Sequence, residues 1–160
     1  MALIHYLTQI QFDFGAVRLL PDECARIGIR RPLVVTDRGV VAAGVAEQAL
    51  APIAGKLQHA LFDETPGNPT EAAVLKALAQ YRSHGADGLI AVGGGSSMDL
   101  AKAVAILATH PGPLTQYATI EGGSPKITAA AAPLIAIPTT SGTGSEVARG
   151  AIIVLTDGRK

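Results

Sequence analysis

The sequence predicts an α/β fold with an open, mostly parallel sheet that carries helices on both faces. Short apolar runs typical of buried strands alternate with longer segments of helical periodicity, which is the pattern of parallel α/β domains. Polar or glycine-rich segments follow several of these runs, at the strand ends where such sheets bind ligands. The chain has 160 residues, which is enough for one domain with a sizeable core.

The clearest strand-to-helix unit spans residues 89–108. Residues 89–92 form an uninterrupted apolar run, as in a strand that is buried on both faces. The apolar period becomes helical from Leu100 onward. Three consecutive glycines, residues 93–95, separate the two patterns, and they can adopt positive φ angles or let the backbone approach a ligand closely.

The start of this helix is a candidate phosphate site. We expect Ser96 or Ser97 to be the N-cap, with Asp99 completing a loose capping box. The free N–H groups and the partial positive charge of a helix N-terminus suit a phosphate. A tight turn without a ligand is the alternative, and the combination of three glycines with two serines favours the phosphate.

The other elements are expected to alternate along the chain. Thr70 is expected to cap a helix, and residues 110–113, with the sequence His-Pro-Gly-Pro, to end the central one. Residues 117–132 are expected to form an exposed excursion. Strands are expected at residues 10–15, 32–37, 56–62, 134–137 and 151–155, and helices at 17–27, 39–50 and 71–83.

Composition argues against several classes of protein. The 13 basic and 13 acidic residues give zero formal net charge, and no cluster of Lys and Arg forms the footprint of a nucleic-acid surface. No apolar run is long enough to span a membrane, and the first residues lack the positive region of a signal peptide. Cys24 is the single cysteine, which excludes an internal disulfide and favours a reducing compartment, so we expect a cytoplasmic protein.

Asp37 ends one of the expected strands and has two interpretations. A carboxylate at this place can accept hydrogen bonds from ribose hydroxyls and repel a 2′-phosphate, which favours NAD over NADP. It can equally be the N-cap of the next helix. The usual dinucleotide fingerprint GxGxxG is absent, and Asp37 precedes the glycines by more than fifty positions instead of following them.

A polar loop at residues 138–146 follows another expected strand. Its hydroxyl groups need partners, and a pyrophosphate or a ribose is one candidate, whereas an ordinary loop that leads into a short helix is the alternative. The loop does not match the nucleophile elbow GxSxG, and no GK[ST] of a P-loop follows the glycines.

The residues show a cofactor platform without catalytic residues or a metal site. Asp99 is interpreted as a helix-start carboxylate and Lys102 as a solvated helix residue. No general base stands beside a nucleophile. The histidines lack the spacing of metal ligands and are interpreted as surface or structural residues: His5, His59, His84 and His110.

Two long motifs resemble those of the iron-containing (group III) alcohol dehydrogenases. GGGSSMDLAK at residues 93–102 resembles the family signature GGGSxxDxAK, and PTTSGTGSEV at residues 138–147 resembles the loop PTTxGTGSEV. VTD at residues 35–37 and NPT at residues 68–70 match two further family positions in the same order. The resemblance extends from about residue 10 to the end of the chain.

The resemblance implies a role for particular residues. In this family a Rossmann-like N-terminal domain binds NAD or NADP, and an all-helical C-terminal domain holds Fe²⁺ or another divalent metal through one Asp and three His. Ala148 stands where the family often has Thr, so one cofactor hydrogen bond is expected to be missing. By resemblance, Gly94, Gly95 and Ser96 bind the pyrophosphate, Asp37 lies at the adenine ribose, Asn68, Thr139, Thr140 and Thr143 line the cofactor cleft, and Lys160 matches a lysine near the cofactor.

The resemblance also implies a function and a domain organisation. Residues 1–160 are expected to be the NAD(P)-binding domain, truncated before the helical metal domain, with all four metal ligands beyond Lys160. The whole protein would transfer hydride between an alcohol/aldehyde pair and the cofactor, and this chain alone would be inactive. Family members usually dimerise or form larger assemblies, which allows a homo-oligomer and leaves the oligomeric state of this chain open. A non-catalytic nucleotide- or phosphate-binding module is the alternative from another class. A glycerol or dehydroquinate-type enzyme is a further alternative, against which the Ser-Glu ending of the GTGSE segment argues.

Overall fold

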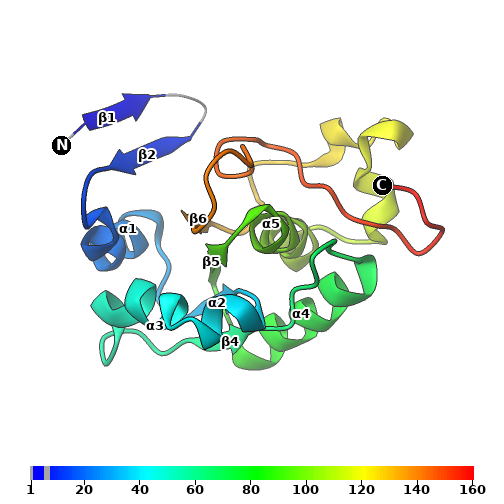
Figure 1. Cartoon of the computed structure of the whole chain (residues 1–160). Helices are drawn as coiled ribbons and strands as arrows, with labels where there is room; N and C mark the ends of the chain where they lie inside the picture. The colour runs from blue at the N-terminus through cyan, green and yellow to red at the C-terminus, as the bar shows by residue number, and fades with distance from the viewer. Residues whose placement is uncertain (1, 6–7) are drawn as a thin grey trace.

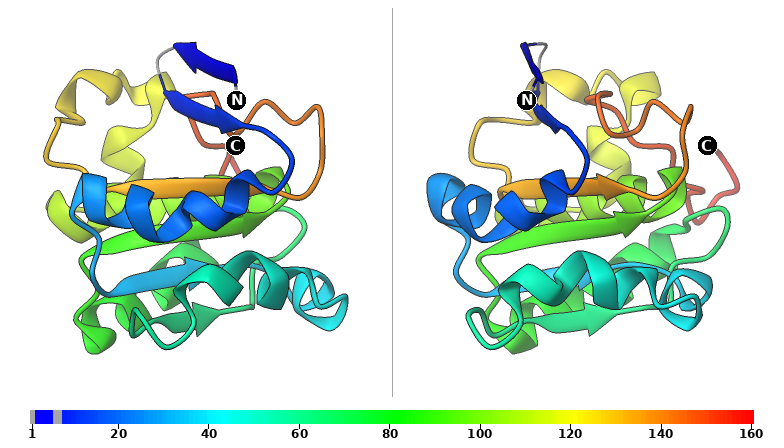
Figure 2. Two further views of the ribbon diagram at one scale, coloured as in Figure 1. Left: turned by 90° about the vertical axis from the view of Figure 1, so that its left-hand side faces the viewer. Right: turned by 60° about the vertical axis from the view of Figure 1, so that its left-hand side comes forward.

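The computed structural model describes residues 2–5 and 8–160 and contains a four-stranded parallel sheet in the order β4-β3-β5-β6. The four strands run in the same direction, as Figure 2 shows. Ile90 of β5 pairs with Val34 of β3 on one side and with Ile135 of β6 on the other. The bounds of the strands are β3 Pro32–Val35, β4 Ala60–Phe62, β5 Gly88–Gly93 and β6 Leu134–Pro138.

Helices cover both faces of this sheet, which confirms the predicted open, parallel α/β class (Figure 1). One face carries α1 Leu20–Ile27, α2 Arg38–Ala42 and α3 Val45–Leu50, and the other carries α4 Glu71–His84 and α5 Gly95–Thr109. Single turns of 3₁₀ helix connect these elements: η1 Ala16–Leu19, η2 Ala51–Ile53, η3 Leu114–Tyr117, η4 Thr119–Glu121 and η5 Ser124–Lys126. None of the helices in the described residues is both long and apolar enough to cross a membrane.

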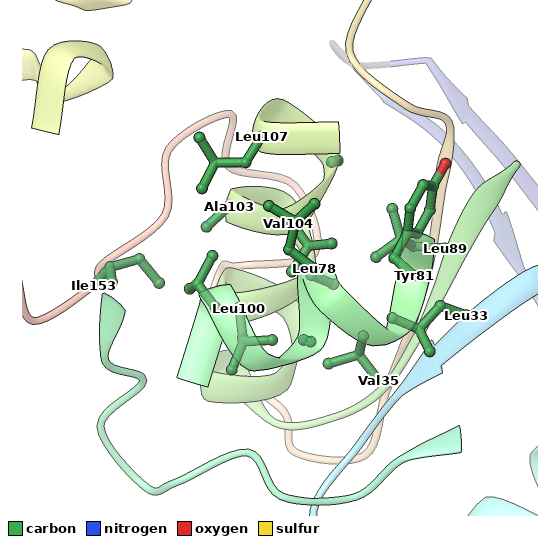
Figure 3. Close-up of a cluster of buried hydrophobic side chains, with 14 of the residues drawn as sticks. Leu33, Val35, Leu78, Tyr81, Leu89, Leu100, Ala103, Val104, Leu107 and Ile153 are labelled. Atoms are coloured by element: carbon green, nitrogen blue, oxygen red, sulfur yellow. The ribbon is translucent and has the colours of Figure 1, made fainter. Parts of the chain in front are cut away.

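Alternating side chains of the strands build a core on each side of the sheet. Leu33 and Leu89 face α4 and α5, whereas Val34 and Ile90 face α1 and α3, as the period of two in a strand requires. Figure 3 shows the first of these cores, where α4 and α5 pack together over β3 and β5. Each fully buried Leu or Val side chain contributes about 1.5–3 kcal/mol to stability. Every residue of β5 is buried, as its apolar run predicts.

Several predicted helix boundaries are confirmed. Gly28 ends α1 with φ of 81°, although the first predicted turn is the separate 3₁₀ turn η1. Thr70 caps α4, and α5 ends before the His-Pro-Gly-Pro segment. The helix predicted over residues 39–50 is broken into α2 and α3, because Gly44 takes a left-handed conformation with φ of 71°.

Other strand predictions need correction. Residues 151–155 form no strand: Val154 makes one bridge with Thr70, while Ile153 and Leu155 are buried in the core beside α4 and α5. The strand predicted over 56–62 is shorter, since Lys56 and Leu57 donate backbone hydrogen bonds to Ile53 and continue the turn after η2.

The edge strand β6 is half-buried, although its apolar run predicts a buried strand. Within the described residues it pairs only with β5. The excursion over residues 117–132 is exposed in most of its middle, yet Tyr117 and Ala132 at its two ends are buried. Near the end of the excursion, the Thr128 backbone N–H donates a hydrogen bond to His110 Nε2 (3.0 Å).

The N-terminal segment forms a separate antiparallel ribbon of β1 Ala2–His5 and β2 Gln9–Phe12. The strand predicted over residues 10–15 corresponds to β2 and ends earlier, whereas β1 carried no prediction. Figure 1 shows this ribbon apart from the main sheet. The side chain of His5 lies outside the described part of the structure.

Candidate functional site

A cleft of about 360 Å³ lies at the carboxyl ends of β3, β5 and β6. Asp37 follows the first of these strands, Gly94 the second and Thr139 the third, so the parallel sheet brings together segments that are far apart in the sequence. This is the place where open parallel sheets bind their ligands. The cleft is lined by Asp37, Val40, Thr65, Pro66, Gly67, Gly94, Gly95, Ser96, Ser97, Thr139 and Thr140.

Helix α5 opens into this cleft without a side-chain cap. Gly94 occupies the N-cap position, and no side chain accepts a hydrogen bond from the first N–H groups of the helix. The prediction of a serine cap is wrong, because the Ser96 hydroxyl donates to the carbonyl of Gly67 (2.7 Å) instead. Asp99 does not complete a capping box, since its carboxylate accepts a hydrogen bond from the backbone N–H of Ile152 (3.0 Å). The N–H groups of the first turn therefore lack acceptors from the helix.

Gly93 and Gly95 are needed for close approach, whereas Gly94 leaves room for a side chain. A Cβ on Gly93, which has φ of 156°, would lie 2.6 Å from the Ser97 hydroxyl oxygen. A Cβ on Gly95 would lie 3.1 Å from the Ser145 hydroxyl oxygen, and one on Gly94 would lie 3.4 Å from that of Thr140. The glycines thus let the polar loop pack against the start of α5, with bare backbone facing the cleft.

Asp37 is an N-cap in the structure, as one of its two interpretations predicts, and it also lies in the cleft wall, where the other interpretation needs it. Its Oδ1 accepts a hydrogen bond from the Val40 N–H (3.0 Å), which makes it the N-cap of α2. The side chain is half-buried and lines the main cleft as well as an adjoining pocket of about 420 Å³. In that pocket the carboxylate of Glu64 lies 2.6 Å from the Lys76 ammonium, whose hydrogen bond lowers the pKa of Glu64.

The remaining predicted site residues, Asn68, Thr143 and Lys160, are not among the residues that line the cleft, although Asn68 directly follows Gly67, which does. Lys160 Nζ donates a hydrogen bond to Asn68 Oδ1 (2.9 Å), which joins two predicted residues from distant parts of the chain. The Thr143 hydroxyl donates to Glu146 Oε2 (3.1 Å), and its Cβ lies 3.4 Å from the place where a Cβ on Gly95 would stand.

Two buried hydroxyl groups in the cleft wall were missed by the sequence analysis. Thr65 and Ser97 are 8% and 1% exposed, and neither side-chain oxygen has a hydrogen-bond partner in the structure. Both residues line the cleft. Ser97 was predicted only as a possible cap, and Thr65 carried no prediction. The available signal was a hydroxyl residue within a few positions of an expected strand end.

Lys102 and Asp99 also differ from their predictions. Lys102 is not a solvated residue: its side chain is 13% exposed, and its Nζ donates to the carbonyl of Gly150 (2.9 Å). The carboxylate of Asp99 lies 3.6 Å from that Nζ. Burial lowers the pKa of Lys102, and the charges of Asp99 and Glu146 oppose this shift.

The fold and the cleft define an open parallel α/β domain with a ligand site over the carboxyl ends of its strands. The chain belongs to the iron-containing alcohol dehydrogenase family, whose model matches residues 8–160. Both the predicted family and its Rossmann-like fold are confirmed.

Relatives of known name are considerably longer than this chain. The 4-hydroxybutyrate dehydrogenase of Cupriavidus necator is 74% identical over 160 residues, which are 100% of this chain and 42% of the relative. The choline dehydrogenase of Bacillus subtilis (strain 168) is 40% identical over 91% of this chain and 36% of its own length.

Solved structures share the fold over a similar part of their length. The crystal structure of a 1,3-propanediol oxidoreductase superposes with a TM-score of 0.81 and 33% identity, covering 89% of this chain and 37% of that one. Sulfoacetaldehyde reductase from Bifidobacterium kashiwanohense, solved in complex with NAD⁺, gives a TM-score of 0.77 at 27% identity over 91% and 38% of the two chains. This chain therefore spans less than half of the proteins it matches.

The residues of the cleft fit a dinucleotide, and the described residues do not fit a metal. Bare glycine backbone, an uncapped helix and unpaired hydroxyls are the groups that a diphosphate requires. Among the described residues, no three His, Cys, Asp or Glu side chains are placed so that they could hold a metal ion. We therefore derive no metal-dependent step from this chain.

Proposed function

We propose that the cleft binds the dinucleotide NAD, with its diphosphate at the start of α5. The observation that carries this proposal is the uncapped N-terminus of a 15-residue helix opening into a cleft. The N–H groups of Gly94, Gly95 and Ser96 would donate to the phosphate oxygens, where the helix dipole adds a favourable charge. The hydroxyls of Thr139 and Thr140, which line the same cleft, would close over the same groups.

Asp37 would lie at the adenine ribose and favour NAD over NADP. Its Oδ1 is occupied by the Val40 N–H, which leaves Oδ2 to accept a hydrogen bond from a ribose hydroxyl. A 2′-phosphate at this place would meet the charge of the carboxylate. Asn68, Thr143 and Lys160 would contact the cofactor farther from the adenine.

We further propose that residues 1–160 are the NAD(P)-binding part of an alcohol dehydrogenase that is completed by an all-helical metal-binding domain. When bound, NAD accepts or donates the hydride that interconverts an alcohol and an aldehyde. This chain would bind the cofactor, orient it and shield its diphosphate from water. The relative of 74% identity makes 4-hydroxybutyrate the first substrate to test on the whole protein. The buried Cys24 favours a reducing compartment such as the cytoplasm.

Titration of the chain with NADH, followed by the fluorescence of the nicotinamide, tests the binding proposal. A Gly94→Val substitution puts a side chain into the cleft and is expected to weaken binding by roughly two orders of magnitude. Ala72→Val, at the exposed start of α4, puts the same side chain at a helix start outside the cleft and is expected to leave binding unchanged. Wild-type protein that fails to bind NADH, or a Gly94→Val variant that binds it normally, would contradict the proposal.

A further inference from the structure

The loop at residues 139–150 is attached to the sheet and to α5 at its two ends. At the first end, the Thr139 N–H donates to the carbonyl of Gly93 (2.9 Å). At the far end, Lys102 Nζ donates to the carbonyl of Gly150 (2.9 Å) and Asp99 Oδ2 accepts from the N–H of Ile152 (3.0 Å). Two neighbouring charged side chains of one helix thus hold two backbone groups of one segment.

Between these ends the hydrogen bonds of the described residues are local to the loop itself. Residues 139–150 are all described and form neither helix nor strand. Gly142 and Gly144 have φ of 89° and 73°, and the carbonyl of Gly144 accepts hydrogen bonds from the Val147 and Ala148 N–H groups. Thr140, on the cleft wall, is exposed. The position of the loop hydroxyls therefore depends on where the two ends are fixed.

We infer that Asp99 and Lys102 are positioning residues for the cofactor, because they hold the far end of the loop whose threonines face the start of α5. The inference rests on the proposed function. Their side chains are 10% and 13% exposed, so their charges have lost much of their hydration. An apolar pair would fill such a place at lower cost. A charged pair that bonds backbone groups at Gly150 and Ile152 instead selects one position of the segment.

The test compares Lys102→Met with wild type in two measurements. NADH titration is expected to give a dissociation constant about tenfold higher, which matches the loss of one charge-assisted hydrogen bond. Hydrogen exchange of the amides of residues 140–149 is expected to become faster, while exchange in α4 stays unchanged. Lys102→Arg keeps the charge and the donors, so its dissociation constant is expected to stay within about threefold of wild type.

Arg26→Met is the matched control, since Arg26 and Glu23 form an ion pair of the same i,i+3 spacing on α1 (2.6 Å). It is expected to change neither NADH binding nor loop exchange. A folded Lys102→Met variant with unchanged binding would overturn the inference. If that variant does not fold, the test uses Asp99→Asn, which makes the hydrogen bond to the Ile152 N–H a weaker, neutral one and removes the charge beside Lys102 Nζ. This variant must weaken binding severalfold for the inference to stand. Wild-type protein that does not bind NADH would overturn the proposed function, whereas loop exchange unaffected by Lys102→Met would overturn the positioning role alone.

Discussion

Helices α4 and α5 pack side by side on one face of the sheet, and their N-termini are built in opposite ways (Figure 1). The start of α4 is closed by its own chain: the Thr70 hydroxyl accepts from the Ala73 N–H (3.2 Å), and the Glu71 N–H donates to the carbonyl of Val154 (2.9 Å). The start of α5 has glycine at the cap and no acidic residue in its first turn. Two helices of similar length thus differ in whether their first N–H groups are satisfied internally.

The presence or absence of a cap distinguishes the start of α4, which is a structural element, from the start of α5, which can bind a ligand. A side-chain cap contributes about 1 kcal/mol of stability, and α5 forgoes it. Glu71 at the capped start is itself occupied, since its Oε2 accepts from the Thr156 backbone and hydroxyl groups. Of these two starts, that of α5 opens into the cleft, where an external acceptor can take the place of the missing cap.

The largest expected effect comes from giving α5 the cap that it lacks. Gly94 has φ and ψ of −81° and −168°, an extended conformation that other residues adopt, so Gly94→Asp can fold without backbone strain. The new carboxylate is expected to raise the free energy of unfolding by about 0.5 kcal/mol and to weaken NADH binding at least ~100-fold by repelling the diphosphate.

Chemical denaturation and NADH titration of Gly94→Asp check both expectations. Thr70→Asp is the matched control, because it puts the same carboxylate at the N-cap of α4, where binding is expected to stay unchanged. Normal NADH binding by Gly94→Asp would mean that the two helix starts do not differ in function.

The start of α2 is an intermediate case, since Asp37 is both a cap and part of the cleft wall. Asp37→Ser keeps an oxygen for the Val40 N–H and removes the charge, so the preference for NAD is expected to fall by about tenfold relative to NADP. Asp63→Ser is the control, because Asp63 lines the adjoining pocket and not the main cleft. An unchanged ratio of the two dissociation constants for Asp37→Ser would rule out the role of this carboxylate at the ribose.

The smallest expected effect is at the capped helix. Thr70→Ala removes the acceptor for the Ala73 N–H and is expected to lower the free energy of unfolding by about 1 kcal/mol. The dissociation constant for NADH is expected to remain within about twofold, because the start of α4 is outside the cleft. Thr70→Ser keeps the hydroxyl and should restore the stability. A large loss of NADH binding in Thr70→Ala would show that the two helix starts are coupled.

The sequence predicts the start of α4 correctly and that of α5 incorrectly, for a physical reason. Thr70 caps the N–H of Ala73, three residues away, so the local sequence pattern is enough to predict this helix start. The Ser96 hydroxyl instead bonds Gly67, which lies 29 residues earlier, and no local pattern shows this partner. The predictions for Lys102 and Asp99 are wrong for the same reason: their partners, at Gly150 and Ile152, lie about fifty residues further along the chain.

The fold class and most of the cleft follow from local patterns. The apolar run of β5 predicts a strand buried on both faces, and parallel strands necessarily bring their carboxyl ends together. The segment at residues 151–155 has an equally apolar run, yet Ile153 and Leu155 pack against α4 and α5 without joining the sheet. Apolar residues predict burial in both places, and only the tertiary structure decides whether burial occurs in a strand.

Nuclear magnetic resonance of the ¹⁵N-labelled chain during titration with NADH observes both helix starts in one experiment and so shows which of them binds the cofactor. The amide signals of Gly94, Gly95 and Ser96 are expected to shift most, and those of Ala72 and Ala73 at the capped start of α4 are expected to stay in place. Shifts at α4 that equal or exceed those at α5, or binding that leaves the α5 amides unmoved, would contradict the proposed binding site.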